Sequence, residues 1–232
     1  MTGWFITGTD TGVGKTRVAA GLIAALRSRG VKALGMKPVA CGLVSEGGVH
    51  YSEDVDAICH SSGQKPASFS LNPYKFIRPV SPHIAAELEG KSIELDVIVR
   101  EFSTLAADGP VVVEGAGGWE VPISDSQSMA DVARALQLPV VLVVGLRLGC
   151  LNHALLTARA IAATGLPLAG WIGNRIDEDF AESEANLATL CSRLGSTPLA
   201  VLPYSHSPRS ALPALGEAAT HLLGAAHRAG DR

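Results

Sequence analysis

Six short apolar runs recur along the chain, separated by stretches in which apolar residues follow a helical spacing. The runs cover residues 4–7, 31–36, 111–113, 139–145, 168–173 and 199–202. Most of them are rich in Val, Ile or Leu without alternating polar residues, which is typical of parallel strands buried on both faces. The pattern predicts the strands of a central, mostly parallel sheet.

The stretches between these runs predict helices. Over residues 17–29 the apolar positions 18, 22, 23 and 26 share one face. Similar patterns predict helices over 54–62, 93–107, 129–136, 152–164 and 182–194, and a terminal helix over about 214–227 with frayed ends. This alternation predicts a doubly wound α/β fold of three layers, with ligands bound beyond the carboxyl ends of the strands.

Two stretches break the alternation. Residues 41–53 are rich in Gly, Ser and Glu and predict a loop, whereas residues 63–82 carry four prolines and predict irregular structure. An irregular stretch of this length is unusual in a compact domain and is often functional. We expect one domain over residues 1–232, with 208–232 forming a C-terminal helix and tail.

Composition narrows the classes of function. With 47% hydrophobic residues among 232 the chain can bury a sizeable core, and its net charge of −3 without long charge runs gives no sign of a nucleic-acid surface. No apolar stretch approaches the ~20 residues of a membrane span, and the N-terminus lacks the features of a secretory signal. The four cysteines form no C-x-x-C pair, which suits a reduced compartment rather than disulfides or zinc. We expect a cytoplasmic protein without nucleic-acid or membrane partners.

A glycine-rich loop lies between the first apolar run and the first predicted helix. It reads Gly8-Thr9-Asp10-Thr11-Gly12-Val13-Gly14-Lys15-Thr16. Glycines let the backbone amides turn toward phosphate oxygens, and the helix that follows adds its positive N-terminal end. In this context Lys15 is expected to reach the β- and γ-phosphates and the Thr16 hydroxyl to hold Mg²⁺. The loop predicts a nucleoside triphosphate site and a P-loop NTPase-like fold.

The loop departs from the usual G-x4-G-K-[ST] spacing. That spacing places the first glycine at position 9, where this chain has Thr9, and its glycine lies one position earlier at Gly8. The variant points to a subgroup of phosphate-binding loops.

Charged residues follow two other predicted strands. Glu114 directly follows Val111-Val112-Val113, where P-loop proteins keep a second metal ligand, and the small residues Gly115, Ala116 and Gly117 let backbone approach a phosphate. Lys37 follows the second run, so it is expected on the same rim, where it could neutralise a transferring phosphoryl group. On the residues alone, an ordinary solvated lysine is the favoured interpretation of Lys37.

Two helix starts add candidates that the residues alone leave open. Glu53, Asp54 and Asp56 are equally plausible acids on chemistry alone, and each could be a first-turn acid. The segment Gly149-Cys150-Leu151-Asn152 could offer free amides to a carboxylate, or Asn152 could simply cap the helix.

These features together resemble the dethiobiotin synthetase family, whose members close the ureido ring in biotin synthesis. The resemblance covers roughly residues 3 to 205, in the order in which the family has its motifs. The segments that match are G-T-D-T-G-V-G-K-T (8–16), M-K-P-V-A-C-G (36–42), N-P-Y-K-F-I-R-P-V-S-P-H (72–83), V-E-G-A-G-G-W (113–119), V-V-G-L-R-L-G-C-L-N-H-A (143–154) and G-W-I-G-N-R (170–175).

The resemblance implies a P-loop α/β fold with about seven strands, a homodimer, and an ATP-dependent cyclo-ligase. The family takes 7,8-diaminononanoate, CO₂ and ATP to dethiobiotin, ADP and phosphate. A carbamate of the substrate attacks the γ-phosphate to give a carbamic–phosphoric anhydride, and the second amine then closes the ring and expels phosphate.

Residue roles also follow from the resemblance. It places Mg²⁺ on Thr16, Asp54 and Glu114, assigns Lys37 as the catalytic lysine beside Lys15, and makes Thr11 a phosphate or carbamate contact. Residues implied to hold ATP are Gly12, Val13, Gly14, Lys15, Thr16, Arg17, Gly115, Ala116 and Gly117 around the phosphates, Asn174 and Arg175 at the adenine edge, and Pro203, Tyr204 and Ser205 around the base. The backbone at Cys150, Leu151 and Asn152 of a partner subunit is implied to hold the substrate carboxylate.

The chain departs from the family pattern at two positions. Cys41 stands where relatives have Ser or Thr in contact with the substrate, and a thiol is the weaker hydrogen-bond donor. Gly12 stands where some members carry an acid. The contact of residue 41 with the substrate is therefore in doubt.

The main alternative is a ParA/MinD-type ATPase, a nucleotide-dependent dimer switch that positions cargo. The loop of that class carries an additional lysine, and its place here is taken by Asp10. The loss of that lysine argues against a switch.

Overall fold

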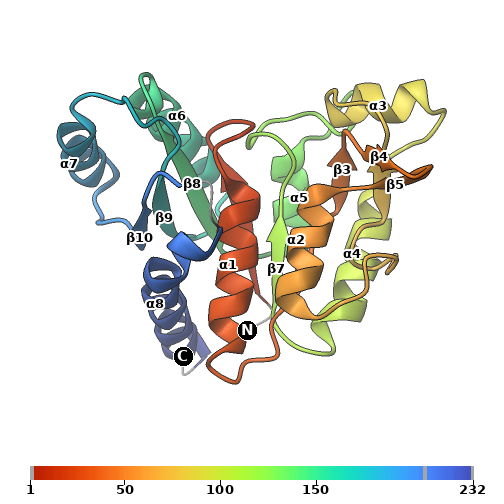
Figure 1. The fold of residues 1–232 in the computed structure, drawn as a ribbon, viewed down its shortest axis with the longest axis horizontal. Coiled ribbons are helices and arrows are strands. Elements are labelled where there is room, and N and C mark those ends of the chain that lie inside the picture. The colour runs from red at the N-terminus through yellow and green to blue at the C-terminus, as the bar shows by residue number, and fades with distance from the viewer. Residues whose placement is uncertain (1–2, 206–207, 231–232) are drawn as a thin grey trace.

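The computed structural model describes residues 3–205 and 208–230, and its centre is a six-stranded parallel sheet (Figure 1). The strands run in the order β10-β9-β8-β1-β7-β2. Their bounds are β1 (Gly3–Gly8), β2 (Leu34–Met36), β7 (Val111–Glu114), β8 (Val140–Leu146), β9 (Leu168–Arg175) and β10 (Ala200–Leu202). Each predicted apolar run corresponds to one strand. The predicted doubly wound parallel sheet is confirmed, with six strands in the described part of the chain where about seven were expected.

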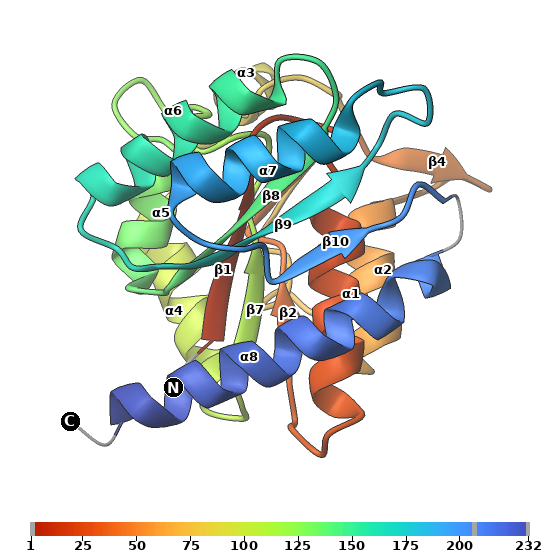
Figure 2. The ribbon, with the colours of Figure 1, turned by 90° about the vertical axis from the view of Figure 1, so that its left-hand side faces the viewer.

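Helices cover both faces of this sheet (Figure 2). One face carries α1 (Lys15–Arg27), α2 (Glu53–Ser62) and α8 (Leu212–Gly230), and the other carries α4 (Leu95–Ala106), α5 (Met129–Leu136), α6 (Cys150–Ala163) and α7 (Ser183–Leu194). The predicted helices are thus present within a few residues of their expected bounds. Residues 231–232 of the predicted tail lie outside the described residues.

Alternation along the strands builds the two cores. Phe5 and Val113 point into the core beneath α4 and α5, whereas Trp4, Ile6 and Val112 point into the core beneath α1 and α8. Successive side chains of a strand face opposite sides, so a strand between two helical layers needs apolar residues at every position. This requirement explains why the six runs do not alternate.

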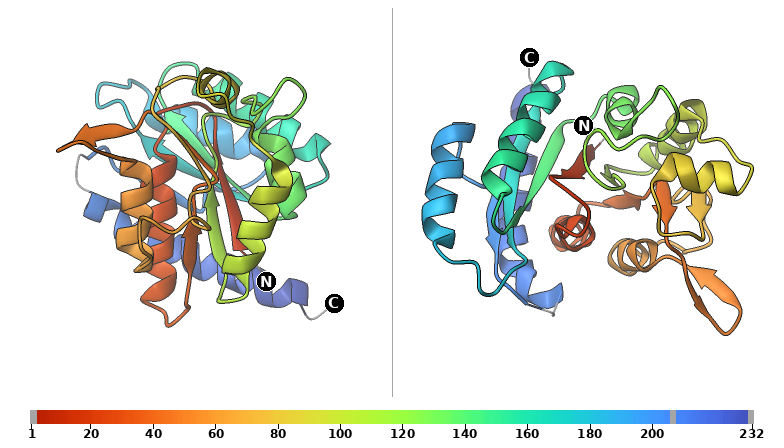
Figure 3. Two further views of the ribbon diagram at one scale, coloured as in Figure 1. Left: turned by 90° about the vertical axis from the view of Figure 1, so that its right-hand side faces the viewer. Right: turned by 90° about the horizontal axis from the view of Figure 1, so that it is seen from above.

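The predictions for residues 41–53 and 63–82 are wrong in part. A hairpin, β4 (Val44–Glu46) and β5 (Val49–Tyr51), projects from one edge of the molecule (Figures 1 and 3). Its largely exposed strands carry no hydrophobic pattern, but Gly47 and Gly48, both with positive φ, form the kind of two-residue turn that suits a hairpin. The proline-rich stretch contains β6 (Tyr74–Phe76), paired with β3 (Val39–Cys41), and leads into α3 (Pro82–Leu88).

The topology places a crevice at the carboxyl end of β1. The chain leaves β1 for α1 on one face, whereas it leaves both neighbours of β1, β7 and β8, for helices α5 and α6 on the opposite face. Connections that diverge to opposite faces open a gap where ligands bind in such folds. The glycine-rich loop and Glu114 both border this gap.

None of the helices in residues 3–205 and 208–230 combines the length and apolar character needed to cross a bilayer.

Packing of α8 on α1 generates a stability prediction. Leu215 is fully buried against Gly21, where an added Cβ would lie 2.2 Å from the Leu215 Cδ1 atom. Leu215→Ala is expected to lower the free energy of unfolding by about 2–5 kcal/mol, because it removes buried methyl groups and leaves a cavity. Leu212→Ala, on the same helix but 40% exposed, is the matched control and is expected to change it much less. Equal losses in urea unfolding of the two variants would contradict this packing.

Candidate active site

The glycine-rich loop joins β1 to α1 and leaves the start of the helix open. Gly14 precedes the helix with φ of 93°, and no side chain caps the first turn, which also lacks acidic residues. The first amides of a helix have no partner within the helix, so they remain available to an anion. Gly14 is further required because a Cβ there would lie 2.2 Å from the Asn174 Nδ2 atom.

Lys15 folds back over its own loop. Its Nζ donates to the Asp10 carbonyl oxygen at 2.9 Å, and the residue is 6% exposed. Burial, together with the nearby charge of Lys37, lowers the pKa of Lys15 to about 8. The loop therefore holds a partly desolvated cation that a phosphate group would stabilise.

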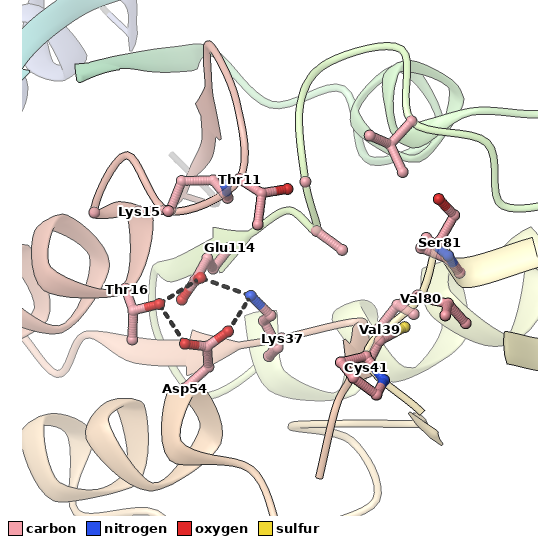
Figure 4. A pocket seen from close by; sticks show the side chains of 17 residues that line it. Thr11, Lys15, Thr16, Lys37, Val39, Cys41, Asp54, Val80, Ser81 and Glu114 are labelled. Carbon is pink, nitrogen blue, oxygen red and sulfur yellow. Dashed lines mark hydrogen bonds and ion pairs between the residues drawn. The ribbon is translucent and has the colours of Figure 1, made fainter. Parts of the chain in front are cut away.

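Four side chains from four different segments meet beside the loop (Figure 4). The Thr16 hydroxyl lies 2.5 Å from Asp54 Oδ1 and 2.8 Å from Glu114 Oε1. The Lys37 Nζ atom lies 2.6 Å from Glu114 Oε1 and 2.7 Å from Asp54 Oδ2. Thr16 and Lys37 thus bridge the same two carboxylates, and the expected convergence of these residues is confirmed in position.

Strand pairing explains this convergence. β7 lies between β1 and β2, so Glu114 at its end lies beside both the glycine-rich loop and Lys37. Asp54 enters from the first turn of α2, where the Ser52 hydroxyl accepts a hydrogen bond from the Val55 amide. Of the three acids left open by the sequence, Asp54 is the one that contacts Thr16 and Lys37.

Lys37 is 4% exposed, so its interpretation as a solvated lysine is wrong. Burial by itself would lower the pKa of Lys37, but the carboxylates of Glu114 and Asp54 raise it above its ordinary value. Burial raises the pKa of Glu114 despite Lys37, and Lys37 and Thr16 lower the pKa of Asp54 despite burial. The ammonium of Lys37 is held charged by these two acids.

Asn72, to which the sequence reasoning gave no role, fixes the backbone at Lys37. Its Nδ2 donates to the Lys37 carbonyl at 2.6 Å, and the Lys37 amide donates to the Leu71 carbonyl at 2.8 Å. Asn72 is fully buried within the proline-rich stretch. A buried polar residue in irregular structure is a signal of such anchoring, but the sequence alone does not reveal its burial.

The oxygen atoms of this cluster fit a magnesium ion. Mg²⁺ prefers a few carboxylate and hydroxyl oxygens and completes its shell with phosphate and water. Thr16, Asp54 and Glu114 supply such oxygens within hydrogen-bond distance of one another. Glu114 Oε2 is also buried without a hydrogen-bond partner, which is the state expected of an atom that awaits a cation.

The pocket around this cluster has a volume of about 570 Å³ and two unlike ends (Figure 4). Thr11 lies at the end beside the charged cluster, and the Gly115 carbonyl accepts from Lys37 at 3.3 Å. Val39, Cys41, Val80 and Ser81 lie at the other end, and the rest of the lining includes Gly12, Ala116, Gly117, Pro79, Pro82 and Val121. A ligand with a charged head and an apolar body suits this shape.

The residues expected at the base lie on another side of the loop. The Asn174 Nδ2 atom donates to the Val13 carbonyl at 2.9 Å, and Arg17 bonds both Asn174 Oδ1 and the Pro203 carbonyl. The Arg17 side chain therefore joins this group rather than the pocket. Arg175 does not join it, because its guanidinium bonds Ser183 at 2.5 Å and Glu184. Tyr204 and Ser205 follow Pro203 on the partly exposed surface.

The segment Cys150–Asn152 begins α6 and does not line the Lys37 pocket. Cys150 is buried, Asn152 is exposed, and no side chain caps the helix, so the interpretation of Asn152 as a cap is wrong. The Cys150 amide donates to the Arg147 carbonyl at 3.0 Å, whereas the amides of Leu151 and Asn152 belong to the first turn of α6, whose amides have no partner within the helix.

Asp10 takes part in an ion pair that the sequence did not suggest. Its Oδ2 atom lies 2.5 Å from Arg147 Nη2, which belongs to the segment between β8 and α6. The position that carries a lysine in the ParA/MinD class thus holds a carboxylate paired within its own chain.

Comparison with known proteins agrees with this geometry. A domain family described as an AAA domain matches residues 2–210. The chain is 50% identical over 202 residues to the ATP-dependent dethiobiotin synthetase BioD of Aromatoleum aromaticum, covering 87% of this chain and 90% of that protein. It is 45% identical to the protein of the same name from Xanthomonas oryzae, over 92% of this chain and 96% of that one.

Solved structures with low sequence identity share the fold. The cell division ATPase MinD of Pyrococcus furiosus superposes with a TM-score of 0.60 at 17% identity, covering 97% of this chain and 99% of that chain. A chain of the Aquifex aeolicus MinC:MinD cell division protein complex superposes with the same score at 14% identity, covering 97% of this chain and 96% of that chain. Likeness at this identity shows the fold alone.

Burial of Cys41 generates a prediction about its reactivity. Burial raises the pKa of the Cys41 thiol to about 11, against the opposing effect of Lys37. A raised pKa keeps the thiol protonated, so at pH 8 only about one thiol in a thousand is the reactive thiolate. Iodoacetamide labelling of Cys41, followed by peptide mass spectrometry, is expected to be slow at pH 8 and to rise about tenfold per pH unit up to pH 10. A labelling rate that levels off below pH 9 would contradict this environment.

Proposed function

This chain belongs to the family of ATP-dependent dethiobiotin synthetases, and we propose that it closes the ureido ring of dethiobiotin from 7,8-diaminononanoate, CO₂ and ATP. It is an ATP-dependent cyclo-ligase of biotin biosynthesis by its relationship to those enzymes. The single observation that carries the detailed reaction is the buried Lys37 ammonium, which lies between Glu114 and Asp54 beside the glycine-rich loop.

The reaction must bring two anions together. A carbamate and a triphosphate repel each other, so their approach requires concentrated positive charge in a desolvated site. Lys37 and Lys15 both border one pocket and are 4% and 6% exposed. Their placement supports a phosphoryl transfer in which most of the catalysis is positioning and electrostatic stabilisation.

Thr16, Asp54 and Glu114 would hold Mg²⁺, which supplies charge neutralisation to the phosphate oxygens when bound. The Lys37 ammonium, which lines the same pocket, would bind the carbamate and γ-phosphate oxygens. Thr11 lines the same pocket, and its hydroxyl is proposed to donate to either group.

Three bond-forming steps lead from the diamine to the ureido ring. One amine of the substrate adds to CO₂ and loses a proton, which gives a carbamate. A carbamate oxygen attacks the γ-phosphorus, the bond to ADP breaks, and a carbamic–phosphoric anhydride forms. The second amine attacks the carbonyl carbon, loses a proton and expels phosphate, which retains the attacking oxygen.

Other residues are proposed to bind the adenine base and the substrate carboxylate. Asn174, with the segment Pro203–Ser205, is proposed to hold the adenine, and Arg175 has only a supporting place because its guanidinium is engaged elsewhere. The backbone at Cys150–Asn152, where the amides of Leu151 and Asn152 lie in the first turn of α6, would hold the substrate carboxylate of a neighbouring subunit, which makes the working form a homodimer. We place this enzyme in the cytoplasm, as one domain.

Lys37→Gln tests the role of the buried ammonium. The substitution removes its charge but keeps a donor for Glu114, so kcat is expected to fall about 10²–10³-fold while the Kd for ATP changes less than about tenfold. Lys32→Gln, whose lysine pairs with the exposed Asp108 at the other end of β2, is the matched control and is expected to keep wild-type kcat. A Lys37 variant that is folded by circular dichroism and retains full turnover would refute the assignment.

An isotope experiment tests the proposed intermediate. With ¹⁸O-bicarbonate, ATP and the diamine, mass spectrometry is expected to find one labelled oxygen in phosphate and one in the ring carbonyl for each turnover, provided that the reaction outpaces exchange with water. Phosphate without label alongside ureido product would exclude attack by the carbamate. ATP hydrolysis that needs no diamine and is stimulated by DNA or lipid would favour the dimer switch instead.

A further inference from the structure

The guanidinium of Arg17 ties together three segments that are distant in the sequence. From the first turn of α1, Nη1 donates to Asn174 Oδ1 at 2.9 Å and to the Pro203 carbonyl at 3.0 Å, and Nη2 donates to Ser210 Oγ at 2.7 Å. These partners belong to the end of β9, the segment after β10 and the turn before α8. Arg17 therefore braces the loops beyond the carboxyl ends of two strands.

This contact fixes the orientation of the Asn174 amide. Guanidinium nitrogens only donate, so the Asn174 atom beside Arg17 must be the carbonyl oxygen. The Val13 carbonyl only accepts, so the atom 2.9 Å from it must be the amide nitrogen. A flipped amide would set two donors together at Arg17 and two acceptors together at Val13, and the side chain is 3% exposed. Arg17 and Val13 thus enforce one orientation from two sides.

Asn174 Nδ2 and Oδ1 can each make two hydrogen bonds, and each makes one of them here. Nδ2 carries a second hydrogen and Oδ1 a second lone pair. The amide therefore still offers one acceptor beside one donor, in a fixed order. This donor and acceptor would pair with a base that carries an exocyclic amino group next to an acceptor ring nitrogen. Asparagine pairs with adenine in this way in protein–DNA complexes.

We propose that Arg17 is a positioning residue that makes this enzyme select nucleotides whose base carries an amino group beside an acceptor nitrogen, and reject those with a carbonyl at that place. The proposal rests on the proposed function in one respect, which is that Asn174 meets the base. ATP and CTP carry the required pattern. ITP and UTP carry an oxo group in place of that amino group, so the donor that Asn174 Oδ1 requires is replaced by an acceptor.

The test compares ATP with ITP and CTP with UTP in the wild-type enzyme and in Arg17→Met. Methionine preserves the unbranched aliphatic stem of arginine and removes all the N–H donors of the guanidinium. In the wild type, kcat/KM for the amino nucleotide is expected to exceed that for its oxo partner by at least about tenfold. In Arg17→Met both ratios are expected to fall toward one, through a higher KM for ATP with kcat little changed.

Arg29→Met is the matched control. Arg29 follows the same helix and braces α8 in the same manner, donating to the Gly216 carbonyl at 2.7 Å and to Thr220 Oγ1 at 3.1 Å. It lies at the opposite end of α1 from the loop. Its loss is expected to lower stability while leaving both nucleotide ratios at the wild-type value, which separates positioning of Asn174 from general loosening of the helix.

Ser210→Ala removes one hydrogen-bond acceptor of Arg17. It replaces Arg17→Met in the test if that variant does not fold. It is expected to lower both ratios in the same direction by a smaller factor. Wild-type ratios near one, or ratios unchanged in both Arg17→Met and Ser210→Ala, would overturn the proposal. Absence of ureido product with every nucleotide would instead refute the proposed function, and the binding constants of ADP and IDP would then still decide the role of Arg17.

Discussion

Everything at the active site depends on the pairing of the Lys37 ammonium with the buried carboxylate of Glu114. Glu114 is 1% exposed, and a buried charge without a partner is strongly destabilising, by about 3–5 kcal/mol when one member of such a pair is removed. Lys37 meets this requirement at 2.6 Å and remains charged because Asp54 assists from the other side. Stability of the fold and readiness for anion chemistry thus have the same physical origin.

The sheet delivers this pairing without any special local conformation at Lys37 or Glu114. β7 is hydrogen-bonded to both β1 and β2, so the ends of three strands present the glycine-rich loop, Glu114 and Lys37 side by side. The same order sends the connections around β1 to opposite faces and leaves space for a ligand. The solved MinD structure shares this fold at 17% identity, and a shared fold does not by itself fix which chemistry its side chains perform.

Features that depend on local sequence could be predicted, whereas features that depend on contacts between distant segments could not. The strands were predictable because burial on both faces requires continuous apolar runs, and the loop because its spacing carries its chemistry. The burial of Lys37 was not predictable, because the local sequence Met36-Lys37-Pro38 does not reveal that β7 brings Glu114 beside it. Only the resemblance to the family singled out Lys37 as the catalytic lysine. Likewise Arg17 reads as one more helical arginine until the folded chain brings Asn174 and Ser210 to it.

A crystal structure with Mg²⁺ and a non-hydrolysable ATP analogue tests the central claim most directly. We expect Asp54 and Glu114 to turn to the metal beside Thr16, and the Lys37 Nζ atom to move to within about 3 Å of a γ-phosphate oxygen. A complex in which Lys37 remains on Glu114 and the γ-phosphate lies out of its reach would contradict it.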